Sequence, residues 1–131
     1  SNRVYQEYDA QEGVYVVQWS RMRNRLSGSQ NCQVILHDPA VHATATGDGL
    51  IVMQYQQATN NDSQRGYATV GLQDGEHGIN YTYYNRYAAG ALPLQSGLAI
   101  AWVPSLPQTP AAIAIDSHSG RPAASASSTT R

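Results

Sequence analysis

Hydrophobic and polar residues alternate along most of the chain, which is the pattern of β-strands rather than of helices. The segments with this alternation are 4–8, 14–19, 32–37, 50–56, 67–72, 79–84, 98–103 and, with smaller residues, 111–115. We therefore expect seven or eight strands. Only the segment from Trp19 to Leu26 has a helical alternative, and it is short and rich in arginine.

A period of two also predicts which side chains share a face of each strand. These sets are the predicted core: Tyr15, Val17 and Trp19; Cys32, Val34 and Leu36; Ile51, Met53 and Tyr55; Ala68, Val70 and Leu72; Leu98, Ile100 and Trp102.

Turn-forming residues separate these segments, for example Gly47-Asp48-Gly49 and Asp74-Gly75. Short strands at this spacing predict an all-β fold, an antiparallel β-sandwich of the jelly-roll kind with seven or eight strands. Two connections, 37–49 and 84–97, are long enough to cross between sheets or to carry function.

The composition changes at Pro104, so we expect a sandwich domain over 1–103 and an extended arm over 104–131. Three prolines stiffen the start of this arm. An alternating segment follows, and it has the composition of a strand that pairs with the sheet edge of another subunit. The predicted subunit contacts are Ala111, Ala112, Ile113, Ala114 and Ile115.

Composition excludes several function classes. The chain has 131 residues, of which 13% are charged, and its formal net charge is −1. It therefore lacks the basic surface that binding to nucleic acid requires. No apolar run approaches the length of about 18 residues that a membrane-spanning helix needs. Cys32 is the only cysteine, so no disulfide forms within the chain.

The stretch from Val14 to Val103 resembles a β-sandwich accessory module that recurs in large secreted and surface proteins of bacteria, often beside gingipain-like peptidases. The resemblance is carried by these pieces: Val16 to Arg21, Cys32 to Ala40, Thr46 to Tyr55, Tyr67 to Leu72, Gly78 to Tyr83 and Gly97 to Ile100. It implies a secreted or cell-surface location and carries no catalytic residues over. A chain that starts at Ser1 fits either a processed secreted protein or one domain of a longer protein.

Catalytic and metal-binding signatures are weak in this sequence. No nucleophile lies in a recognisable catalytic motif, so we expect no enzyme and no cofactor. His37, Asp38 and His42 share one loop but lack the spacing of a zinc site. Oxygen-rich turns leave calcium as a weaker alternative, with Asp48, Asp62 and Asp74 as its candidate ligands.

Tyrosine is the dominant aromatic residue, with nine copies beside two tryptophans and no phenylalanine. The densest aromatic segment is a candidate platform for stacking sugar rings. Its residues are Tyr81, Tyr83, Tyr84, Asn85, Arg86 and Tyr87. Candidate glycosylation sites are Asn61 and Asn80 in sequons, and Ser125, Ser127, Ser128, Thr129 and Thr130 in the arm.

Taken together, these patterns predict a non-catalytic extracellular structural module, a subunit of a filament-like assembly joined through its arm by strand donation. The alternative is a carbohydrate-binding accessory domain of a larger secreted hydrolase. A third interpretation, a spacer between domains, requires neither self-assembly nor glycan binding.

Overall fold

The computed structural model describes residues 2–24, 28–60 and 67–108 of the chain. These residues form eight strands and no helix. The strands are β1 (Arg3–Asp9), β2 (Val14–Arg23), β3 (Ser29–His37), β4 (Ile51–Gln57), β5 (Val70–Gln73), β6 (Gly78–Tyr83), β7 (Arg86–Tyr87) and β8 (Leu98–Trp102). Two antiparallel sheets result, one of five strands and one of three.

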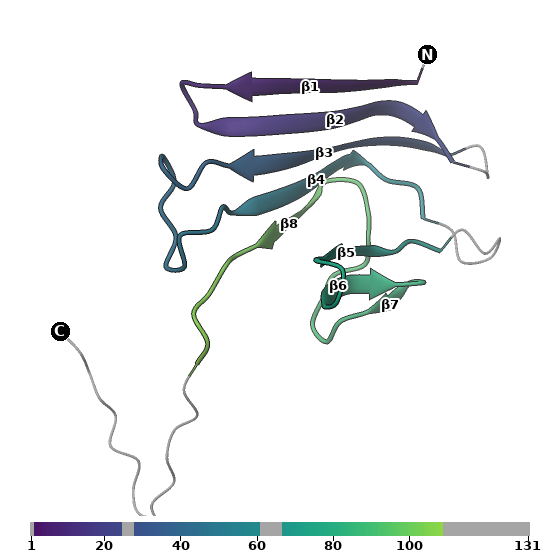
Figure 1. Cartoon of the computed structure of the whole chain (residues 1–131). Helices are drawn as coiled ribbons and strands as arrows, with labels where there is room; N and C mark the ends of the chain where they lie inside the picture. The colour runs from purple at the N-terminus through teal and green to yellow at the C-terminus, as the bar shows by residue number, and fades with distance from the viewer. Residues whose placement is uncertain (1, 25–27, 61–66, 109–131) are drawn as a thin grey trace, which may run out of the picture.

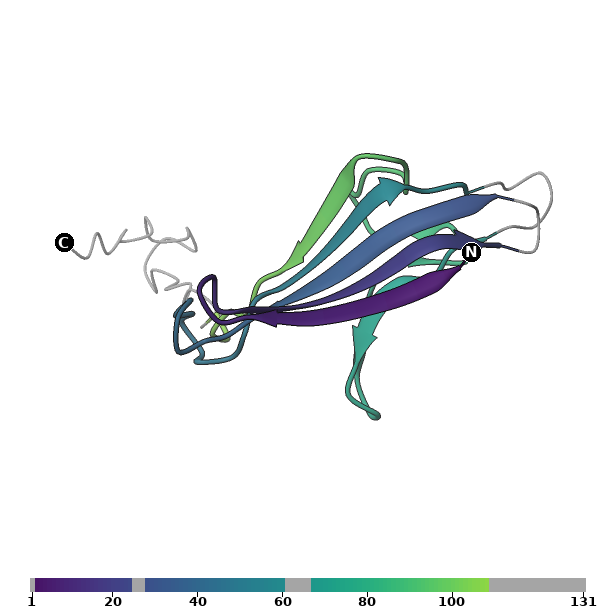
Figure 2. The same ribbon diagram turned by 90° about the horizontal axis from the view of Figure 1, so that it is seen from above.

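The larger sheet has the order β1-β2-β3-β4-β8 (Figure 1). Its first four strands follow one another in the sequence. The chain then forms β5, β6 and β7 of the smaller sheet and returns to the larger sheet as β8. Seen from above, these strands run nearly side by side along the length of the sheet (Figure 2). Consequently β1 and β8 are its two edges.

The register places the one-face sets predicted for β2, β3, β4 and β8 on a common face of the larger sheet, because residues paired across antiparallel strands point to the same side. The fifth predicted set, Ala68, Val70 and Leu72, belongs to the smaller sheet: Ala68 precedes β5, and the register shifts between Val70 and Gly71. One such row runs across all five strands: Val4, Trp19, Cys32, Tyr55 and Leu98. The next two rows are Gln6, Val17, Val34, Met53 and Ile100, then Tyr8, Tyr15, Leu36, Ile51 and Trp102. We call this side the apolar face.

The smaller sheet has the order β5-β6-β7 and lies on the apolar side, near β4 and β8 (Figure 1). Ile51 of β4 lines one hollow together with Leu72 of β5 and Ile79 of β6. Ile100 of β8 is 6% exposed and is the one buried apolar side chain in the described part of the chain. Thr82 of β6 is fully buried.

The all-β prediction is confirmed, and several details differ from it. The helical alternative for Trp19 to Leu26 is wrong for residues 19–23, which belong to β2. This strand continues to Arg23 past a register shift between Trp19 and Met22. The two-residue strand β7 falls inside the predicted connection 84–97, and its two residues were too few to show a period. The predicted strand 111–115 lies outside the described residues.

The loop after β3 closes over the turn between β1 and β2. The backbone N–H of Asp38 donates to the carbonyl of Gly13 at 2.9 Å, and a ring nitrogen of His42 lies 2.7 Å from the carbonyl of Glu12. Gly13 is buried with φ of 64°, and a Cβ placed there would lie 2.7 Å from Val41. Only glycine combines this backbone conformation with so close an approach.

We predict that Gly13→Ala destabilises the protein by about 2–4 kcal/mol, since the substitution adds both left-handed strain and a steric clash. Gly47→Ala is the matched control. Gly47 also has positive φ, 83°, but nothing lies within 4 Å of its Cβ position. This control should cost about 1 kcal/mol. Equal losses for the two variants in denaturant unfolding would show that the loop contact is unimportant.

Candidate interaction surface

The apolar face of the larger sheet is covered unevenly. Near β8 the buried Ile100 lies on the side that faces the smaller sheet. Toward β1 the exposed fractions are 55% for Val4, 54% for Tyr8 and 40% for Leu36. We call the apolar side chains of β1, β2 and β3 on this face the open apolar surface: Val4, Tyr8, Val17, Trp19, Val34 and Leu36.

Strand β1 borders the open apolar surface and forms a free edge of the sheet. Among the described strands it pairs only with β2, and all seven of its residues are exposed. Sheet edges are usually protected by charged side chains, lysine above all, by proline or by a bulge. β1 has no lysine or proline, and its register with β2 is unbroken from Arg3 to Asp9.

The charges of β1 do not cover the apolar face. Arg3, Glu7 and Asp9 alternate with Val4 and Tyr8, so they point to the other side of the sheet. A strand that approaches this edge from outside would therefore meet unpaired backbone groups beside an uncharged apolar surface.

A hollow that is open to solvent lies where the two sheets meet. Ile51, Leu72 and Ile79 line it, its volume is about 400 Å³, and Ile79 is 58% exposed. The smaller sheet therefore covers the apolar face only partially here as well.

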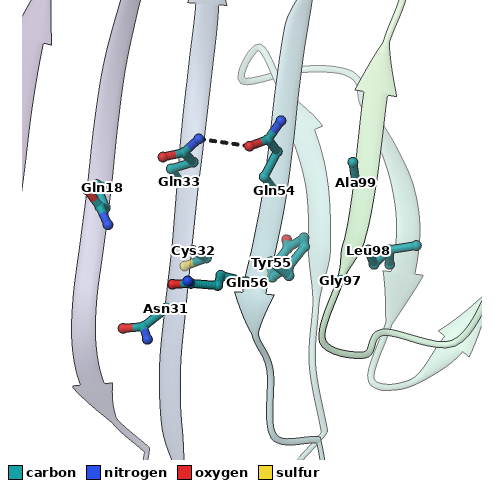
Figure 3. A pocket seen from close by; sticks show the side chains of 10 residues that line it. All are labelled: Gln18, Asn31, Cys32, Gln33, Gln54, Tyr55, Gln56, Gly97, Leu98 and Ala99. Carbon is teal, nitrogen blue, oxygen red and sulfur yellow. Dashed lines mark hydrogen bonds between the residues drawn. The ribbon is translucent and has the colours of Figure 1, made fainter.

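The opposite face of the larger sheet carries a row of amides. Gln18, Gln33 and Gln54 lie directly across from one another on β2, β3 and β4 (Figure 3). The Nε2 of Gln33 donates to the Oε1 of Gln54 at 2.8 Å. These three side chains, with Gln56 and Ala99, line a hollow of about 480 Å³ that contains no charged residue. This polar row is suited to contact with water, whereas the next row on the same face is apolar on β2, β3, β4 and β8 and consists there of Val16, Ile35, Val52 and Ala101.

Cys32 and Tyr55 share a row of the apolar face, and burial affects both. Burial raises the pKa of the Cys32 thiol, which disfavours the reactive thiolate. Burial also raises the pKa of Tyr55 to about 12, with smaller contributions from Cys32 and Tyr81. Both residues are thus suited to packing rather than to nucleophilic or acid–base chemistry near neutral pH.

The six residues predicted as a sugar platform differ in their contacts. Tyr87 accepts hydrogen bonds from the Nδ2 of Asn60 at 3.1 Å and from the N–H of Leu94 at 3.0 Å. The Oδ1 of Asn85 accepts from the N–H of Ala68 at 2.7 Å, and Tyr81 donates to the carbonyl of Leu92 at 2.5 Å. These three side chains therefore hold the connections of the smaller sheet together.

The remaining members of that set, Tyr83, Tyr84 and Arg86, are exposed. Tyr67, which sequence reasoning did not include, joins them: its ring centroid lies 6.4 Å from that of Tyr84. No local pattern signals this contact, because Tyr67 precedes β5 and Tyr84 follows β6.

The candidate calcium ligands within the described residues lie in separate turns. Asp48 is exposed in the loop after β3, where its backbone N–H donates to Thr46 Oγ1 at 3.2 Å. Asp74 Oδ1 accepts from the N–H groups of His77 and Glu76, which lower the pKa of its carboxyl group. No group of three or more His, Cys, Asp or Glu side chains that could hold a metal ion occurs within residues 2–24, 28–60 and 67–108.

His37 and His42 contact each other but have structural partners. Their ring centroids lie 5.0 Å apart in a T-shaped arrangement. A ring nitrogen of His37 lies 3.2 Å from the carbonyl of Leu50, and His42 contacts Glu12 as described above. The pair therefore anchors the loop between β3 and β4.

Several predicted residues lie outside the described part of the chain. They are Asn61, Asp62, the subunit contacts 111–115, and Ser125, Ser127, Ser128, Thr129 and Thr130. Of the two sequons only Asn80 is described, exposed on β6, two residues before the buried Thr82. The described residues also include no helix with the length and hydrophobicity of a membrane span.

No protein-family model matches this chain, and neither the curated protein sequences nor the solved structures include a match to it. Its function must therefore be argued from its own surfaces.

We predict a loss of stability at alkaline pH that depends on Tyr55. Because its folded pKa lies above its ordinary value of 10, Tyr55 stabilises the fold fully below about pH 10 and progressively less as pH rises to about 12. Tyr55→Phe should remove this decline. The free energies of unfolding of the two proteins should differ by a constant below pH 10 and converge, or cross, above it. Curves that stay parallel up to pH 12 would contradict the prediction.

Proposed function

We propose that this chain is a non-catalytic structural module, a subunit of an extracellular or cell-surface assembly in which neighbouring copies join by strand donation. The observation that carries the proposal is the combination of a free β1 edge, whose charges all lie on the opposite face, with the open apolar surface beside it. A strand added at this edge would pair its backbone with β1. Its apolar side chains would extend the same face.

Such a contact is favourable because it pairs the free backbone groups of β1 and covers exposed apolar side chains at the same time. Backbone N–H and C=O groups at the edge gain hydrogen bonds. Each half-exposed apolar side chain that becomes covered contributes about 1 kcal/mol. Val4, Tyr8 and Leu36 are the exposed side chains that stand to gain. A larger sheet covered in this way would approach the complete sandwich that the sequence predicts.

The proposed donor is the alternating segment from Ala111 to Ile115. It follows Pro104 and Pro107, which come directly after β8 at the edge opposite β1. Donor and acceptor therefore belong to opposite edges of one sheet. When the donor edge of one copy meets the acceptor edge of the next, the contact is head-to-tail and extends into a filament unless it closes into a ring.

The proposed extracellular location rests on the resemblance of residues 14–103 to the secreted bacterial module. The spacer interpretation differs from ours in one consequence. A spacer leaves the β1 edge unoccupied, whereas an assembly module needs it filled.

The proposal predicts that the full chain self-associates with rising concentration and that Ile113→Asp with Ile115→Asp abolishes this. Carboxylates at those positions would have to be buried against the apolar face without a partner, which is costly. Sedimentation velocity over a range of concentrations measures the effect. Removal of residues 104–131 should also give a monomer.

Matched controls separate strand donation from general effects on solubility. Ser125→Asp with Ser127→Asp adds the same charge to the arm and should assemble like the unaltered chain. On the acceptor side, Val4→Lys should block assembly. Val103→Lys changes a residue that directly follows β8, is 68% exposed and lies outside β1, so this variant should still assemble. A monomeric unaltered chain, or assembly that survives Ile113→Asp with Ile115→Asp, would refute the proposal.

A further inference from the structure

We propose that the smaller sheet carries a binding site for a neutral oligosaccharide, in a hollow beside Tyr83. This inference goes beyond the proposed assembly role and does not depend on it. The hollow has a volume of about 510 Å³, within the usual range of ligand sites. Its lining consists of Thr69, Gly71, Leu72, Gln73, Glu76, His77, Gly78, Asn80 and Tyr83.

Exposed tyrosine rings form one side of the hollow and continue beyond it. Tyr83 lines the hollow, and its ring centroid lies 4.7 Å from that of Tyr84, which in turn contacts Tyr67. The three residues are 53%, 58% and 45% exposed. Three tyrosines held together yet open to solvent present the apolar faces and polar tips that suit sugar rings. A purely structural cluster would be expected to bury them.

Three exposed polar side chains line the hollow and are accessible to a ligand. Those of Gln73, Glu76 and Asn80 make no hydrogen bond or ion pair within the described part of the chain. Amides donate and accept, and a carboxylate accepts, so together they match hydroxyl groups that do both. An aromatic wall facing such groups is the usual composition of a small-molecule site.

Two glycines in the lining leave room for neighbouring groups. At Gly71 a Cβ would lie 2.5 Å from the carbonyl oxygen of Ile79 and 2.7 Å from the Oδ1 of Asn80. The absence of a side chain there lets the Asn80 amide lie against the β5 backbone. At Gly78 the nearest atoms to a Cβ position are 3.4 Å away or farther, so a side chain could be accommodated there.

The charges around the hollow are mixed, which suits a neutral ligand. Glu76 lines the hollow, and Arg86 pairs with Tyr83 across β6 and β7. The glutamine hollow on the larger sheet is a poorer candidate, because the only aromatic ring in its lining, Tyr55, is half-buried and belongs to a row on the apolar face.

The test is titration calorimetry of the full chain with four probes: cellotetraose, laminaritetraose, mannotetraose and chitotetraose. We expect at least one to bind, and Tyr83→Ala to weaken its affinity about tenfold or more, because the stacking surface is lost. Tyr83→Phe should retain most of the affinity. Asn80→Leu should weaken binding by removing hydrogen bonds while keeping the size of the side chain.

Two further variants fix the position of the site. Gly78→Val should weaken binding by placing a side chain in the lining of the hollow, and a thermal melt verifies that the variant is folded. Gln18→Ala, in the glutamine hollow, is the control and should bind like the unaltered chain. Failure of all four sugars to bind, or unchanged affinity in Tyr83→Ala, would overturn the inference. Either result would leave the assembly proposal standing, because that proposal is measured by sedimentation.

Discussion

The structure depends on how far the smaller sheet covers the apolar face of the five-stranded sheet. Fifteen side chains in three rows point to that face, yet the sheet that lies over it has only three short strands. Its coverage reaches β4 and β8, where Ile100 is buried, and leaves β1 open, where Val4 and Tyr8 are half exposed. Since burial of apolar surface is the main favourable contribution to folding, the uncovered part of this face favours association.

Loop contacts hold each of the two proposed surfaces in place. The loop between β3 and β4 holds the turn after β1 through Gly13 and His42, which fixes one end of the edge strand. The connections around β7 are held by Asn85 and Tyr87, which leaves Tyr83 and Tyr84 facing solvent. Assembly through β1 and sugar binding on β6 would therefore use different sheets, and one copy could do both at once.

Much of the fold follows from local sequence, because a period of two directly fixes which side chains share a face. The one-face sets of β2, β3, β4 and β8 are all confirmed by the register. The sequence could not show which part of the shared face remains open, since that depends on where a distant sheet of three strands lies. For the same reason Tyr67 was missed: it meets Tyr84 only through tertiary structure. Tyr81, Asn85 and Tyr87 were grouped with Tyr83 because composition does not distinguish a side chain that binds its own loops from one that faces solvent.

Amide hydrogen exchange of β1 as a function of protein concentration tests the central claim most directly. Half of the backbone N–H groups of an edge strand point away from the sheet and exchange readily unless another strand pairs with them. We predict that protection of residues 3–9 rises with concentration while that of β6 stays constant. Protection of β1 that is the same at all concentrations, in protein shown to be folded, would contradict the account.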